Sequence, residues 1–183
     1  MNELYDEDIK IAGESAPASD RSGGETEYRL HVGNGNIDKA RALGKTVAEI
    51  TVSTAAISDD DGSGAYPELQ LQRGVLLAFS AVMTLETAIL PGVVEDVAKQ
   101  EFYAVMQRLD PCLYKETTDS GAFSFYYLAY RRGIELERRI GQTFAMLCSH
   151  DGDPVYQELG EALFCWMRSK TEQEVTNIAF IQT

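Results

Sequence analysis

Apolar residues recur three and four positions apart along much of this chain, and that spacing places them on one face of an α-helix. The first such stripe follows the turn-forming residues 33–36 and consists of Leu43, Val47, Ile50, Thr54 and Ile57. A later stripe ends at Asp110-Pro111 and consists of Val94, Ala98, Phe102, Val105 and Leu109. The pattern predicts two amphipathic helices, the second followed by a loop over residues 112–119.

Between these helices lies a stretch that is apolar on nearly every side. From residue 69 to residue 90 the charged residues are Arg73 and Glu86 alone. A helix that is apolar all round is either a membrane span or the centre of a helical core. A span needs about 20 uninterrupted apolar residues, which this stretch does not supply. We therefore predict a buried central helix that begins near Pro67 and ends at Pro91-Gly92.

The remaining sequence predicts two further helices. Aromatic residues open the first at residues 123–130, and its apolar positions continue to Leu147. Asp153-Pro154 begins the last helix, because aspartate is a good N-cap and proline suits the first helical position. Its apolar face is predicted to consist of Val155, Leu159, Ala162, Leu163 and Trp166. Residues 171–174 resemble a capping box, which predicts a kink or a restart there.

Together these elements predict an all-α protein, an irregular bundle of about five helices around a buried central helix. Short loops between helices favour antiparallel neighbours. Residues 28–183 are predicted to form a single all-helical domain. Residues 1–27 are acidic and carry few large apolar groups, so we expect a mobile tail. Leu4, Tyr5, Ile9 and Ile11 would allow part of that tail to dock as a short segment.

Composition narrows the possible partners and the compartment. The formal net charge of −13 argues against nucleic acid, which requires a basic patch, and against an anionic membrane surface. The chain has three cysteines in apolar surroundings, an odd number that suits a reducing compartment. The first residues lack the basic and apolar regions of a secretion signal. We expect a cytoplasmic protein.

The run of residues 59–64 resembles the opening of an EF-hand calcium loop. Asp59, Asp61 and Ser63 would take the first three ligand positions, and Gly64 the glycine of the sharp turn. The twelfth position, where a bidentate glutamate belongs, is Gln70. Weak calcium binding is one hypothesis for this loop, and an acidic glycine-rich turn between two helices is the other. No other cofactor is predicted.

Glu86 is the candidate for a buried functional carboxylate. A buried carboxylate must be paired or protonated, and carboxylates with a raised pKa serve as general acids or bases. A pocket beside Glu86 would be lined by Phe79, Met83, Tyr126, Tyr127 and Tyr130. In the alternative, Glu86 reaches solvent or pairs with an arginine of the aromatic helix. These two readings predict different surroundings for its side chain.

Two further clusters carry candidate chemistry. Residues 148–153 bring a cysteine, a histidine and two aspartates together, which suits either a zinc site or ordinary helix caps. Pairs of arginines at positions 131, 132, 138 and 139 repeat at a spacing of seven. They either bind a phosphate or carboxylate partner or are neutralised by glutamates such as Glu135.

Short catalytic and nucleotide-binding motifs are absent from the sequence. Tyrosine is enriched at protein contacts, so the aromatic helix is the predicted interface. The interface residues would be Phe123, Phe125, Tyr126 and Tyr130. The sequence therefore favours a non-catalytic interaction module that binds itself or another protein. The alternative is a small-molecule-binding bundle or an enzyme with its pocket near Glu86.

Overall fold

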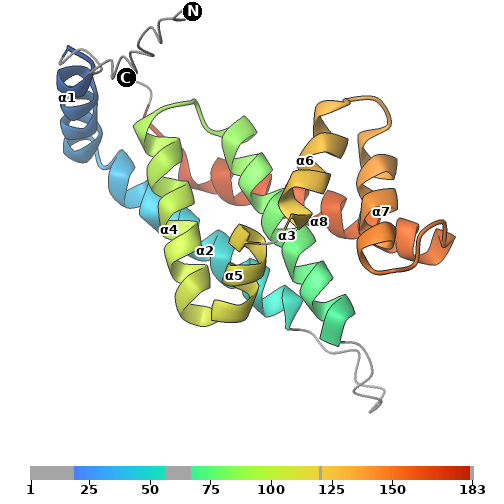
Figure 1. Ribbon diagram of the computed structural model, residues 1–183. Helices are drawn as coiled ribbons and strands as arrows, with labels where there is room; N and C mark the ends of the chain where they lie inside the picture. The colour runs from blue at the N-terminus through green and yellow to red at the C-terminus, as the bar shows by residue number, and fades with distance from the viewer. Residues whose placement is uncertain (1–18, 57–66, 120, 182–183) are drawn as a thin grey trace, which may run out of the picture.

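The computed structural model describes residues 19–56, 67–119 and 121–181, and this part of the chain is all-helical (Figure 1). Its elements are α1 (Ser19–Gly33), α2 (Asn36–Ala55), α3 (Pro67–Ala88), α4 (Val93–Leu109), α5 (Pro111–Asp119), α6 (Ala122–Arg131), α7 (Leu136–Leu147) and α8 (Pro154–Ile178). The all-α prediction is confirmed. None of the described helices is long and apolar enough to cross a membrane.

Helix α3 contains a continuous stretch of buried residues. Residues 74–85 are all buried, and α3 contacts each of the helices from α2 to α8. Two hydroxyl groups lie inside this apolar stretch, and each bonds to the backbone one turn earlier. Ser80 Oγ donates to the Leu76 carbonyl and Thr84 Oγ1 to the Ser80 carbonyl, both at 2.7 Å. These bonds satisfy the hydroxyls, so the helix can be enclosed on all sides.

Residues 111–119 form helix α5, where the sequence suggested a loop. Asp110 and Pro111 stop α4, but they also start the next helix. The Asp110 carboxylate accepts a hydrogen bond of 2.9 Å from the Leu113 backbone N–H, and Pro111 occupies the first helical position. Leu113 and Thr117, one turn apart, are the buried residues of α5.

The predicted long helix from residue 123 to residue 147 is instead two helices. Gly133 has a φ of +69° and Glu135 a φ of +51°. Both values lie in the left-handed region, which a continuous right-handed helix cannot contain. The chain therefore turns between α6 and α7. With α1, α5 and this division, the described residues hold eight helices, compared with the predicted number of about five.

Helix α8 differs from its prediction in two ways. It continues without a break through residues 171–174, because Thr171 is fully buried and cannot act as an exposed cap. Its buried face consists of Gly160, Phe164, Met167 and Thr171. The predicted apolar face is mostly on the surface, with Val155 68% and Trp166 45% exposed.

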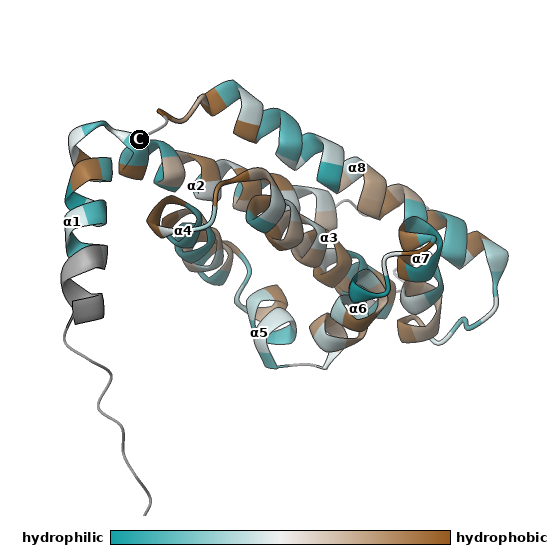
Figure 2. Ribbon diagram, turned by 90° about the horizontal axis from the view of Figure 1, so that it is seen from above, coloured by the Kyte–Doolittle hydropathy of each residue, from teal (hydrophilic) through white to brown (hydrophobic). Residues whose placement is uncertain are grey.

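Helix α1 lies at one end of the molecule, beside the start of α2 and the end of the chain (Figure 2). Asn36 joins these segments. Its side chain donates to the Ile181 carbonyl at 2.8 Å, accepts from the Ile181 N–H at 3.0 Å and contacts His31 Nδ1 at 3.2 Å. Residues 19–27 of the predicted tail are helical, and residues 1–18 lie outside the described part.

Candidate interaction surface on α6 and α7

Helix α6 has two apolar faces, and one of them packs into the core. Ala122, Tyr126 and Ala129 are buried. The ring of Phe79 on α3 lies 5.5 Å from Phe123, 5.3 Å from Tyr126 and 6.3 Å from Tyr130, measured between centroids. Three of the four predicted interface residues, Phe123, Tyr126 and Tyr130, therefore pack against the core. The fourth, Phe125, does not.

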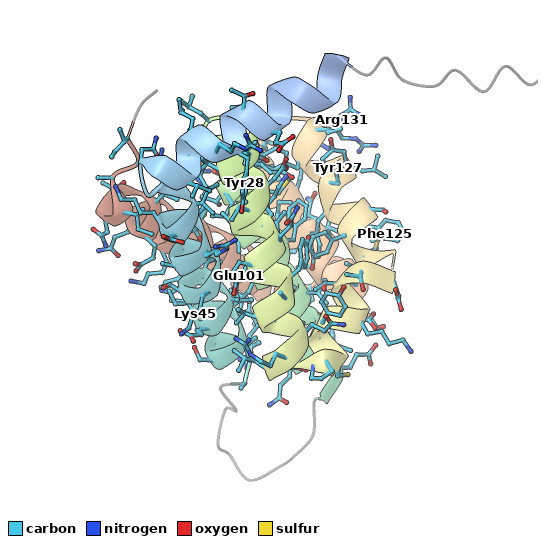
Figure 3. The ribbon with its side chains drawn as sticks, turned by 90° about the vertical axis from the view of Figure 1, so that its left-hand side faces the viewer. Tyr28, Lys45, Glu101, Phe125, Tyr127 and Arg131 are labelled. Atoms are coloured by element: carbon cyan, nitrogen blue, oxygen red, sulfur yellow. The ribbon has the colours of Figure 1, made fainter. Side chains whose placement is uncertain are left out.

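The other face of α6 is exposed. Phe125 is 48%, Tyr127 47% and Leu128 59% accessible to solvent. Figure 3 shows Phe125 and Tyr127 pointing away from the bundle, with Arg131 beside them. Scattered single apolar residues are normal on protein surfaces, but Phe125 and Leu128, three residues apart, share a face of α6 and mark a candidate contact site, whereas Tyr127 lies on another side of the helix.

A groove of about 270 Å³ lies between this outer face and helix α7. Apolar side chains from both helices line it, and charged and amide groups surround them. The lining residues are Phe125, Leu128, Ala129, Arg132, Arg139, Gln142, Thr143, Met146 and Asp151. We call this set the α6–α7 groove. Met146 is 41% exposed, so apolar surface is available on both sides of the groove.

The arginines beside the groove differ in what they contact. Arg138 pairs with Glu135 at 3.6 Å, and among the described residues it is the one arginine of the four with an ion pair to a glutamate. Arg139 Nε donates to the Ile134 carbonyl at 2.8 Å, and Arg131 lies 5.8 Å from the centre of the Tyr127 ring. Within the described residues, Arg132 has no ion-pair partner. Because two arginines, Arg132 and Arg139, line the groove against one carboxylate, Asp151, the groove keeps a positive charge in a strongly acidic chain.

Glu86 lies apart from the aromatic residues that were predicted to surround it. Its carboxylate pairs with Lys99 on α4 at 3.2 Å, and Lys99 also pairs with Glu95 at 2.6 Å. This arrangement matches the alternative in which Glu86 is paired, although the partner is a lysine of α4 and not an arginine of the aromatic helix. The pairing satisfies the carboxylate at the edge of the core.

A separate cavity of about 310 Å³ collects two of the predicted pocket residues, Met83 and Tyr130, with Phe164 and Arg168 of α8. Glu86 does not line this cavity, and Tyr127 faces solvent. Arg168 is engaged by Glu172 at 3.3 Å and by Glu137 at 3.5 Å. The cavity therefore lacks the buried carboxylate on which the hypothesis of a catalytic pocket depended.

The two candidate metal sites have different outcomes. Asp59, Asp61 and Ser63 lie outside the described residues. In the second cluster, His150 stacks on Tyr156 with 3.8 Å between ring centroids, and Asp153 accepts a 2.9 Å capping bond from Val155 N–H. Burial, with a smaller effect of Glu68, raises the pKa of the Cys148 thiol to about 12. The described residues contain no group of three His, Cys, Asp or Glu side chains that could hold a metal ion.

Comparisons with protein-family models, with curated proteins and with solved structures find no match to this chain. Sequence reasoning missed Leu128 and Met146, which complete the apolar part of the groove. The available signal was that α6, like α3, is apolar on more than one face.

Proposed function

We propose that this protein is a non-catalytic interaction module whose α6–α7 groove binds a short acidic and apolar segment of a protein partner. The observation that carries the proposal is Arg132, an arginine without an ion pair among the described residues, beside exposed Leu128 and Phe125. In a chain of net charge −13, a local excess of positive charge next to apolar surface favours a partner that combines negative charge with apolar side chains.

The groove suits a segment that presents a carboxylate and a large apolar side chain close together. The guanidinium of Arg132 can bind a carboxylate through two parallel N–H donors, which fixes orientation as well as charge. Leu128 and Met146 would contact the apolar side chain and lose contact with water. Phe125 supplies aromatic area, which is enriched in the contacts that dominate binding energy.

The proposal treats α3 as the central helix of the bundle and α6 as an element held rigidly against it. Phe79 and Tyr126 pack together at the α3–α6 contact, so the backbone of α6 is fixed while its outer side chains face solvent. A preformed surface of this kind binds with less loss of conformational entropy than a mobile loop. The proposed location is the cytoplasm, with support from three cysteines that are all free thiols.

The test is selection of short random peptides displayed on phage against the full chain. We expect the selected peptides to combine acidic residues with leucine, isoleucine or aromatic residues. Binding should be lost in Arg132→Glu and in Leu128→Ser.

The matched controls are Arg108→Glu and Leu109→Ser, which change an exposed arginine and an exposed leucine at the end of α4. Both controls should bind the selected peptides as the wild type does. Selection of peptides without acidic residues, or equal binding by Arg132→Glu, would contradict the proposal.

A further inference from the structure

The sequence of this chain contains a segment with the chemistry that the groove requires. We infer that residues 3–11 of one copy bind the α6–α7 groove of a second copy, so that the protein assembles with itself through this contact. The inference rests on the proposed function of the groove and names its occupant.

Charge complementarity is the first argument. The segment reads ELYDEDIKI, in which a run of three acidic residues, 6–8, has large apolar residues on both sides and one lysine at position 10. Its acids are Glu3, Asp6, Glu7 and Asp8, and its large apolar residues are Leu4, Tyr5, Ile9 and Ile11. The groove offers the opposite set, with Arg132 and Arg139 beside Leu128 and Met146. The acidic run of residues 59–61 has a large apolar residue close by on one side only, Ile57, and is followed by small residues as far as Tyr66.

The length of chain between this segment and α1 is the second argument, and it favours a second copy. Residues 12–18 separate the segment from Ser19, and seven extended residues span at most about 25 Å. Helix α8, with 25 residues, is about 37 Å long. Its start lies beside the groove residue Asp151, and its end lies beside the junction of α1 and α2, where Asn36 bonds to Ile181 and contacts His31 of α1.

The arrangement of the helices also indicates that residues 12–18 are too short to reach the groove of the same copy. Figures 1 and 2 place α1 at one end of the molecule and α6 with α7 toward the other, separated by α2, α3 and α4. Helix α1 runs across that end in Figure 2 and does not point along α8 toward the groove. A groove on another copy has no such distance limit. If two copies exchange their segments reciprocally, the contact closes into a symmetric pair.

Photo-crosslinking in the full chain tests this inference. Benzoyl-phenylalanine replaces Tyr5, which keeps an aromatic side chain at that position. Copies grown in heavy-isotope medium are mixed with unlabelled copies and irradiated, and the linked peptides are identified by mass spectrometry. We expect links between heavy and light chains that join residue 5 to peptides from residues 122–147.

Charge variants decide whether the link depends on the groove. Arg132→Glu should reduce the yield of this link about tenfold, the effect expected from replacing an attractive contact by a repulsive one. Arg108→Glu should leave the yield unchanged. Changing Asp6, Glu7 and Asp8 to lysine should restore the link in the Arg132→Glu background, which a fold defect in that variant would prevent.

The outcomes separate this inference from the proposed function. Links confined to single chains, links that fall outside α6 and α7, or a yield that does not change in Arg132→Glu would overturn it. If such a result is obtained while acidic, apolar peptides are still selected by the groove, the occupant is a different protein and the proposed function stands. If neither the link nor the peptides depend on Arg132, both are wrong.

Discussion

Replacing Gly44 by alanine should destabilise the protein, although the same change normally strengthens a helix. Gly44 lies in α2 where that helix crosses α4. A Cβ atom at this position would meet the Ala98 carbonyl oxygen and would lie 3.0 Å from the backbone nitrogen of Phe102. Both are backbone atoms, so α4 as a whole has to move to make room. The α2–α4 contact is the most extensive between any two described helices, so the movement disturbs much of the core.

The magnitude follows from two opposing effects. Alanine in place of a mid-helix glycine gains about 0.5 to 1 kcal/mol in helix propensity. Overpacking in a well-packed core costs about 1 to 3 kcal/mol, and the rigid backbone contact at Gly44 places it at the upper end. We expect a net loss of about 2 kcal/mol in the free energy of unfolding, or about 4 to 8 °C in melting temperature for a chain of this size.

Urea denaturation followed by far-UV circular dichroism measures this loss. Gly24→Ala is the matched control, because a Cβ atom there has no neighbour within 4 Å and Gly24 lies inside α1. That variant should be as stable as the wild type or slightly more stable. If Gly44→Ala is equally stable or more stable, the close approach of α2 and α4 is refuted.

Other predictions concern buried polar groups. The hydroxyl of Tyr126 is buried without a hydrogen-bond partner, so Tyr126→Phe should raise the free energy of unfolding by about 1 kcal/mol in urea denaturation. Burial lowers the pKa of Lys99, but hydrogen bonds and charge attraction from Glu95 and Glu86 outweigh burial and raise it above its usual 10.5. The resulting stabilisation is complete below the unfolded-state pKa and is lost as pH rises through the folded-state pKa. As the pH rises into the strongly alkaline range, the free energy of unfolding should therefore fall less for Lys99→Met than for the wild type. Urea titrations at several pH values measure this difference. Iodoacetamide at neutral pH should modify exposed Cys112 and spare Cys148, whose pKa is about 12, until the protein unfolds, as peptide mass spectrometry would show.

The sequence predicts the helices that are bounded by strong signals. Pro67 and Pro91 frame α3, and the residues between them are too apolar for a surface helix. Asp153-Pro154 marks the start of α8, and Asp153 is its N-cap in the structure. The pair Asp110-Pro111 ends α4 and also begins α5. Helix α5 was not predicted because apolar periodicity does not show whether such a pair only ends a helix or also begins another.

The orientation of α8 shows where apolar periodicity fails. Two faces of this helix carry large apolar residues, and the richer one, with Val155 and Trp166, is exposed. The buried face contains Gly160, which lets α8 approach α7 so closely that an added Cβ would lie 2.7 Å from Phe144 Cβ and 3.0 Å from Gly141 Cα. Close packing between two glycines decides the orientation, and a count of apolar residues cannot detect it.

The sequence predicted only part of the candidate surface, again because it does not show which side of a helix faces outward. The aromatic run and the arginine pairs stand out in the sequence, and both lie on α6 and α7. Which side chains face outward depends on the turn at Gly133 and Glu135, because that turn sets α7 beside α6. The interface prediction placed Tyr126 and Tyr130 at the surface, whereas the pocket prediction placed them with Phe79, against which their rings pack.

The most direct test of the interaction surface is a fluorescence-anisotropy titration of one selected acidic, apolar peptide against the full chain at low and at high salt. We expect saturable binding that weakens with salt and is lost in Arg132→Glu, because an arginine–carboxylate contact at the surface is screened by ions. Arg108→Glu should bind as the wild type does. Binding that is insensitive to salt and equal in Arg132→Glu and the wild type would contradict the assignment of the α6–α7 groove as the interaction site.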